Sequence, residues 1–225
     1  MSEAHVSLLN RLAAAIVELH PRLPVRVAID GVDGAGKTTL ADALAAVVAA
    51  QGRTTIRASV DDFHHPRARR YARGRHSPDG HYLDSYDYGS FRKLLLDPLA
   101  PGGSGRYIAR HFDLDNDRPF ELDWQQAKPA AALIVDGIFL HRPELRSYWD
   151  LSIFLKVDFA VSVPRGGQRG PATDLPDPDA PQNQRYLGGQ MRYLSESAPV
   201  QHADIVVDYN DLREPGILKW NGSRR

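Results

Sequence analysis

Short apolar runs alternate along this chain with segments in which apolar residues recur at helical spacing. Apolar runs rich in β-branched residues predict four strands, at 25–30, 54–60, 151–157 and 203–208, and a buried strand at 131–136. Helical spacing predicts helices at 38–50, 88–96 and 185–195, and 107–112 is a weaker strand candidate. Strands that alternate with helices indicate a doubly wound α/β fold, a parallel sheet with helices on both faces.

The first 24 residues predict a leading amphipathic helix. One apolar stripe is formed by Val6, Leu9, Leu12, Ala13, Ile16 and Leu19, and prolines at 21 and 24 end the pattern. The longest apolar run, 12–17, is too short for a signal peptide or a membrane span. An organelle-targeting presequence is the less favoured alternative, because Glu3 and Glu18 are acidic.

Two stretches interrupt the alternation of strands and helices. Residues 64–81 are rich in arginine and histidine, and residues 164–184 are rich in glycine and proline. The second stretch predicts a mobile loop that serves as a lid segment. The length of 225 residues suits one domain over 1–225, made of the leading helix, the α/β core and this lid.

Composition narrows the class of protein. Because 28 Lys and Arg balance 28 Asp and Glu, a surface for nucleic acid or an anionic membrane is not expected. The chain has no cysteine, which excludes disulfides, zinc–thiolate sites and thiol nucleophiles. A reducing, cytoplasmic location and a small-molecule partner are therefore expected.

Residues 31–38 carry the most specific motif of the chain. They read Gly-Val-Asp-Gly-Ala-Gly-Lys-Thr, the P-loop pattern of P-loop NTPases, and stand between a predicted strand and a predicted helix. Glycines let backbone N–H groups turn toward phosphate oxygens, and the helix N-terminus adds a positive dipole end. We therefore predict that ATP is bound by Gly31, Asp33, Gly34, Ala35, Gly36, Lys37, Thr38 and Thr39. In this interpretation Lys37 reaches the β- and γ-phosphates and the Thr38 hydroxyl is a ligand of Mg²⁺.

Carboxylates end two of the predicted strands. Asp136 ends the run 131–136, and Asp61 and Asp62 end the run 54–60. Since the carboxyl ends of parallel strands share one edge of the sheet, all three are expected beside the P-loop. Asp136 is then a metal ligand, directly or through water, and one of the Asp61–Asp62 pair accepts a proton from a substrate hydroxyl. A surface turn at Asp136 and a helix cap at 61–62 stay open as alternatives.

Together these residues resemble the phosphoribulokinase/uridine kinase family of P-loop kinases, over roughly 25–215. Asp61-Asp62-Phe63-His64 resembles the Asp-Ser-Phe-Tyr segment of uridine kinases, which implies that Asp61 is the base. The segment 82–87 resembles the one whose first aspartate binds ribose hydroxyls, which implies that role for Asp84. Asp136-Gly-Ile-Phe is similar to the family's Glu-Gly-Ile-Leu, and the lid position implies phosphate-clamping roles for Arg165 and Arg169.

The resemblance implies a nucleoside-kinase-like enzyme that uses ATP and Mg²⁺. It transfers the γ-phosphoryl group to a hydroxyl, with the 5′-hydroxyl of uridine or cytidine as the favoured acceptor. The expected acceptor contacts are Asp61, Asp62, His64, Tyr82, Asp84 and Phe112. The segment 112–117 lacks the histidine with which uridine kinases read the pyrimidine, so pantothenate, a sugar or a sugar phosphate stays open. A homo-oligomer is also implied.

Other interpretations of single segments stay open. Leu187-Gly-Gly-Gln190 resembles the signature of transporter-type ATPases, although Tyr209 stands where a catalytic glutamate should follow Asp208. A non-catalytic nucleotide-binding module is a third class. The histidines of the segment 64–81 lack regular ligand spacing, so solvated or substrate-facing roles are favoured over metal binding. The arginines of 67–75 are read as a solvated face rather than an anion site.

Overall fold

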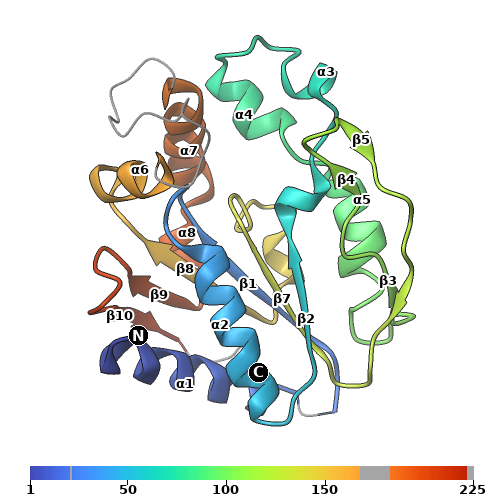
Figure 1. Ribbon diagram of the computed structural model, residues 1–225, viewed down its shortest axis with the longest axis vertical. Helices are drawn as coiled ribbons and strands as arrows, with labels where there is room; N and C mark the ends of the chain where they lie inside the picture. Colours follow the sequence, from blue (N-terminus) through green and yellow to red (C-terminus); the bar gives the residue numbers. More distant parts are fainter. Residues whose placement is uncertain (21, 168–182, 222–225) are drawn as a thin grey trace.

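The computed structural model describes residues 1–20, 22–167 and 183–221. Six strands form its central sheet, in the order β10-β9-β8-β1-β7-β2 (Figure 1). Their bounds are β1 (Val25–Gly31), β2 (Thr55–Ser59), β7 (Ala132–Gly137), β8 (Leu151–Lys156), β9 (Ile205–Asp208) and β10 (Gly216–Trp220). Within this sheet β2, β7, β1, β8 and β9 pair in parallel, each with the next, and β10 pairs antiparallel with β9.

All five predicted strands are confirmed, although the edge strand β2 alternates buried with half-buried positions and 203–208 is not the last strand. β10 follows it and is half-exposed along its length, so it lacks the apolar run by which buried strands are recognised. The sheet is therefore mostly parallel, with one antiparallel edge, which is common in doubly wound folds.

Helices cover both faces of the sheet. One core cluster joins alternate residues of β1, β7, β8 and β9 to α1 (Glu3–Glu18) and α2 (Lys37–Ala50), with Leu12 and Leu44 fully buried. The other strand residues face a second cluster, which contains Phe91 and Tyr193. Each large apolar side chain buried here contributes about 1.5–3 kcal/mol, which holds the helices against the sheet.

The remaining helices lie mostly on the side of the second cluster. They are α3 (Arg67–Arg70), α4 (Pro78–Asp84), α5 (Tyr88–Phe91), α6 (Phe159–Gly167), α7 (Gln184–Ser197) and α8 (Pro199–His202). The predicted helix 88–96 begins as α5 and continues as a π-helical turn over 92–96. The chain also forms short 3₁₀ turns at 60–63 and 146–148.

Two of the predicted elements have the wrong bounds. The leading helix occupies 3–18 of the predicted 1–24, and Val6 is 42% exposed while Leu8 takes a buried place on the stripe. Segment 107–112 adds no strand to the central sheet; its ends belong to the two-residue strands β3 (Arg106–Tyr107) and β4 (Phe112–Asp113). These pair antiparallel with β6 (Gln125–Gln126) and β5 (Arg118–Pro119), respectively.

The predicted lid, 164–184, overlaps a helix at each of its ends. Residues 164–167 form the end of α6, with Pro164 inside the helix, and Gln184 begins α7. The predicted helix at 185–195 is confirmed as α7. Residues 168–182, and with them Arg169, lie outside the described residues. In the part of the chain that the structure describes, no helix has both the length and the apolar character needed to cross a bilayer.

Candidate active site

The P-loop lies between the end of β1 and the start of α2, as the motif requires. Gly34 and Gly36 have φ angles of 72° and 89°, a left-handed conformation that side chains other than glycine adopt at a cost. Gly36 is the N-cap of α2, so the helix N-terminus faces the loop. The Lys37 ammonium donates to the carbonyl oxygen of Val32 at 2.8 Å, which folds this side chain back against its own loop.

Thr38 and Asp136, the two predicted metal ligands, are in direct contact. The Thr38 hydroxyl donates to Asp136 Oδ2 at 2.6 Å. The neighbouring strands β1 and β7 pair Ile29 with Asp136, which brings the end of β7 beside the P-loop. The Asp136 side chain is 2% exposed, and its Oδ1 accepts from the Arg57 guanidinium at 2.7 Å. Both carboxylate oxygens are therefore paired within the protein.

Arg57 was not predicted as part of the site. It lies on the edge strand β2, where its Nη1 donates to the carbonyl oxygen of Ile134 at 2.6 Å and its Nε donates to Asp42 at 2.9 Å. Arg57 therefore holds a buried negative charge at the predicted metal site. An arginine within an apolar run was a signal in the sequence, but nothing in the run says which carboxylate it meets.

Asp61 follows β2 at the same edge of the sheet. Its Oδ1 accepts from the Tyr86 hydroxyl at 2.8 Å, and its backbone carbonyl oxygen is 2.7 Å from His64 Nδ1. Burial, followed by the nearby Asp61 charge, raises the pKa of Tyr86 well above its usual value, so this phenol remains a hydrogen-bond donor at neutral pH. Burial also lowers the pKa of His64, which favours its neutral form. Asp61 itself is exposed and open to an acceptor.

The two other predicted acidic contacts are paired with arginines. Asp62 Oδ1 lies 3.0 Å from Arg110 Nε, and burial raises the pKa of Asp62. Asp84 Oδ2 lies 2.8 Å from Arg73 Nε. An acceptor that binds Asp84 through its hydroxyls must therefore share this carboxylate with Arg73.

Tyr82 and Phe112 are placed in packing rather than at an open surface. Each is 4% exposed. The Tyr82 ring packs edge-on against Phe139, and its hydroxyl is 3.2 Å from the hydroxyl of Ser197. Because neither ring offers a free face, we assign both to the core and not to substrate stacking.

Helix α6 lies directly over the P-loop. A Cβ atom added to Gly34 would come within 2.0 Å of the carbonyl oxygen of Ser162 and 2.9 Å of the Gly166 nitrogen. Arg165, the predicted phosphate clamp on α6, donates to the carbonyl oxygens of Tyr209, at 2.9 Å, and Asn210. Its guanidinium is thus held by the loop after β9.

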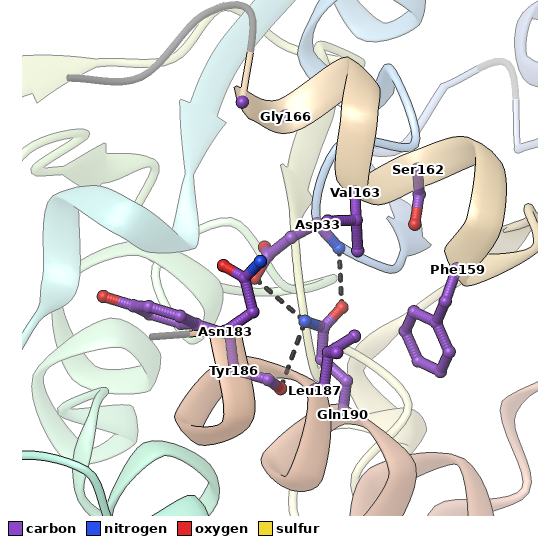
Figure 2. Close-up of a pocket in the computed structure, with 10 residues that line it drawn as sticks. Asp33, Phe159, Ser162, Val163, Gly166, Asn183, Tyr186, Leu187 and Gln190 are labelled. Carbon is purple, nitrogen blue, oxygen red and sulfur yellow. Dashed lines mark hydrogen bonds between the residues drawn. The ribbon is translucent and has the colours of Figure 1, made fainter. Parts of the chain in front are cut away.

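Helix α7 also contacts the P-loop, through Gln190. The Gln190 amide exchanges two hydrogen bonds with Asp33, and a cavity of about 230 Å³ lies beside this pair between α6 and α7 (Figure 2). The cavity is lined by Asp33, Phe159, Ser162, Val163, Gly166, Gly167, Asn183, Tyr186, Leu187 and Gln190. The sequence placed Asp33 in the loop but did not indicate its contact with α7.

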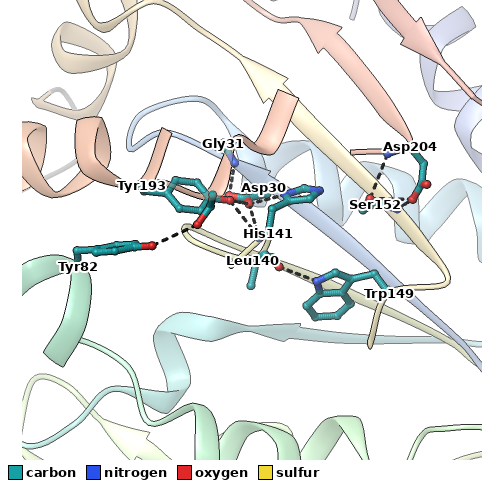
Figure 3. Close-up of polar contacts among 10 residues, drawn as sticks. Asp30, Gly31, Tyr82, Leu140, His141, Trp149, Ser152, Tyr193 and Asp204 are labelled. Carbon is teal, nitrogen blue, oxygen red and sulfur yellow. Dashed lines mark hydrogen bonds and ion pairs between the residues drawn. The ribbon is translucent and has the colours of Figure 1, made fainter. Parts of the chain in front are cut away.

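Behind the loop, a buried polar cluster centres on Asp30 (Figure 3). Its Oδ1 accepts from the Gly31 N–H at 2.7 Å, and its Oδ2 accepts from His141 Nδ1 at 2.7 Å and from the Tyr193 hydroxyl. Asp30, His141 and Tyr193 are each at most 2% exposed. The cluster ties the end of β1 to the segment after Asp136 and to α7.

In the described part of the chain, few side chains are placed to bind a metal ion without help from a substrate. Across residues 1–20, 22–167 and 183–221, no three His, Asp or Glu side chains are grouped closely enough to hold an ion. A hydroxyl and one carboxylate, the Thr38 and Asp136 pair, suit Mg²⁺ that retains waters and binds chiefly to substrate phosphates.

Neither a family model nor a curated protein sequence matches the chain. Solved structures do match. A candidate uridine kinase from Bacillus stearothermophilus is 22% identical with a TM-score of 0.71, covering 89% of this chain and 97% of its own. A candidate fructose transport system kinase from Silicibacter sp. TM1040 is 27% identical with a TM-score of 0.64, covering 87% and 94%. Phosphoribulokinase from Rhodobacter spheroides is 16% identical with a TM-score of 0.55, covering 83% and 70%.

The chain has the fold of the phosphoribulokinase and uridine kinase group of P-loop kinases. The predicted doubly wound α/β class is thereby confirmed. The ends of β2 and β7 lie beside the end of β1, where the P-loop begins, because Ser59 pairs with Asp136 and Asp136 pairs with Ile29. Asp136 and, just after β2, Asp61 are thereby on the P-loop side of the sheet.

Proposed function

We propose that this protein is an ATP-dependent kinase that transfers the γ-phosphoryl group to a hydroxyl of a small molecule. The observation that carries the proposal is the contact of Thr38 with Asp136 beside the P-loop, with the exposed Asp61 at the end of the adjacent strand. A nucleotide loop, a metal-ordering pair and a free carboxylate at one sheet edge are the parts that phosphoryl transfer needs. A non-catalytic nucleotide-binding module would have no need of a carboxylate such as Asp61 at this position.

Each step is assigned to residues of this chain. The P-loop N–H groups and the α2 N-terminus hold the phosphates, and Lys37 leaves Val32 to neutralise charge on them. Bound Mg²⁺ supplies further neutralisation of the transferred group. Asp61 accepts the proton of the attacking hydroxyl, and the donor Tyr86 keeps this carboxylate oriented. Arg165, once released from the carbonyl oxygens of Tyr209 and Asn210, and Arg169 are proposed to clamp the phosphates.

A nucleoside is the favoured acceptor, phosphorylated on its 5′-hydroxyl. The motif resemblance at Asp61 and Asp84 and the structural likeness to a candidate uridine kinase support uridine or cytidine. The second candidate is a sugar. The likeness to a candidate fructose transport system kinase supports it.

The test is ATP consumption with Mg²⁺ across nucleosides, sugars, sugar phosphates and pantothenate, with product masses measured. A nucleoside monophosphate would support the favoured acceptor. A phosphorylated sugar would retain the mechanism and replace the acceptor. Hydrolysis without any acceptor would contradict the kinase and favour an ATPase.

Substitutions test the assigned roles. Lys37→Ala is expected to abolish transfer by weakening ATP binding. Asp61→Asn keeps an oxygen for Tyr86, so it is expected to bind ATP normally while transfer falls about 10²- to 10⁴-fold. Asp62→Asn is the comparison: if it loses transfer and Asp61→Asn does not, the base is Asp62.

A further inference from the structure

Gln190 of α7 makes a two-point contact with the P-loop residue Asp33. The backbone N–H of Asp33 donates to Gln190 Oε1 at 2.7 Å, and Gln190 Nε2 donates to Asp33 Oδ2 at 3.1 Å (Figure 2). Gln190 Nε2 also donates to the carbonyl oxygen of Tyr186 at 3.2 Å, which anchors the amide to its own helix. Gln190 is 3% exposed whereas Asp33 is exposed, so the contact is shielded from water on the α7 side only.

The chemistry of this contact is specific to a side-chain amide. The Asp33 backbone needs an acceptor, and the Asp33 carboxylate needs a donor a short distance away. A glutamine supplies both from one planar group. A glutamate of the same shape supplies only acceptors, and a leucine of similar size supplies neither.

A second contact from the same face of α7 lies at the start of the loop. Tyr193, three residues after Gln190, donates its hydroxyl to Asp30, which also accepts from the Gly31 N–H (Figure 3). Residues three apart on a helix are neighbours, so α7 holds positions 30 and 33 with adjacent side chains. The loop between them carries Gly31, the first glycine of the motif.

We propose that Gln190 is a positioning residue for the nucleotide: it holds Asp33, and through it the P-loop, in the shape that binds the phosphates of ATP. This role rests on the proposed function. Helix α6 contacts Gly34 and helix α7 contacts Asp33, so both helices touch the P-loop. Gln190 therefore links the position of α7 to the geometry of the phosphate site.

The test measures the Kd of ATP with Mg²⁺ by calorimetry, which requires no acceptor. Gln190→Leu, which removes the contact without adding charge, is expected to weaken ATP binding about tenfold. Gln190→Glu places a second carboxylate against Asp33 and is expected to weaken it further. The double variant Asp33→Asn/Gln190→Glu restores a donor–acceptor pair between the two side chains, although not the bond from position 190 to the Tyr186 carbonyl, and is expected to bind ATP at least about threefold more tightly than Gln190→Glu.

Met191→Glu is the matched control, since it adds the same charge to α7 at a side chain that is 60% exposed and away from the loop. It should leave the Kd within about twofold of the unaltered value. Thermal melting of every variant separates a loss of fold from a loss of loop geometry. The single variant Gln190→Glu and the double variant Asp33→Asn/Gln190→Glu have the same size, so their comparison stands even where Gln190→Leu lowers the melting temperature.

Unchanged ATP binding in Gln190→Leu would overturn the inference. So would a double variant as weak as Gln190→Glu, because the Asp33 carboxylate would then be needed for itself and not for its partner. If the unaltered protein does not bind ATP, the proposed function fails and this inference fails with it.

Discussion

Removing Arg57 should destabilise the protein by leaving a buried charge without its partner. Arg57→Leu deletes the guanidinium that lies 2.7 Å from Asp136 Oδ1, and the Asp136 side chain is 2% exposed. Breaking a fully buried pair costs about 3–5 kcal/mol. The Thr38 hydroxyl still reaches Oδ2, and the Arg57 side chain is 24% exposed, so water can enter. We therefore expect a loss of about 2–3 kcal/mol, or about 4–12 °C in the melting temperature for a chain of this size.

Two further variants separate the buried ion pair of Arg57 with Asp136 from its exposed ion pair with Asp42. Asp42→Ala removes the other ion pair of Arg57, at 2.9 Å, whose carboxylate is 65% exposed; such pairs contribute about 0–1 kcal/mol. The double variant Arg57→Leu/Asp136→Asn removes the uncompensated charge and should recover part of the loss. Thermal melting of the four proteins at one ionic strength gives the comparison.

Mg²⁺ provides an independent readout of the same argument. A divalent ion can replace the positive charge of Arg57 at Asp136, so it should raise the melting temperature of Arg57→Leu more than that of the unaltered protein. If Arg57→Leu loses no more stability than Asp42→Ala, or gains nothing extra from Mg²⁺, the account of Arg57 is refuted.

Two other predictions follow from the burial of His81 and the close contact at Gly34. Burial, with a smaller contribution from Arg185, lowers the pKa of His81 to about 3. Between the unfolded pKa of 6.5 and this value, His81 is protonated in the unfolded chain and neutral in the folded chain. As the pH falls, this residue should lower the free energy of unfolding by about 1.4 kcal/mol per pH unit. Denaturant titration at several pH values should show that this pH dependence is lost in His81→Phe and kept in His76→Gln. Gly34→Ala should lose ATP binding and about 1–3 kcal/mol, because its Cβ would meet α6 at 2.0 Å. Gly52→Ala has a similarly positive φ with nothing within 4 Å, so an equal loss of ATP binding there would contradict the steric argument.

The strands could be predicted because burial on both faces leaves a simple trace in the sequence. β7 is buried at all six positions and β1 at all seven; β7 is apolar up to Asp136, and β1 is apolar apart from Arg26 and Asp30. β10 has no buried position, and its Trp220 and Ile217 pack only partly against the first cluster. An edge strand of this kind is defined by its partner β9, which the local pattern does not contain.

The contact of Thr38 with Asp136 could be predicted for a related reason. The motif places Thr38 at the start of α2, and the apolar run places Asp136 at a strand end, so parallel pairing alone brings them to one edge. The exposure of Tyr82 and Phe112 could not be predicted in this way. An aromatic residue near a substrate motif has the same local sequence pattern whether it stacks on a ligand or packs in the core. Here both side chains pack in the core and are 4% exposed.

The residues that the sequence did not reveal share one property: each meets the site across a long stretch of chain. Arg57 contacts Asp136, and Gln190 contacts Asp33, 157 residues away. The motif specifies the groups that bind phosphate, but a glycine-rich loop has many backbone conformations, and selecting one costs conformational entropy. The polar side chains that hold the loop must come from packed elements such as α7. The chemistry of this site is thus local in sequence, while its geometry depends on contacts that only the fold creates.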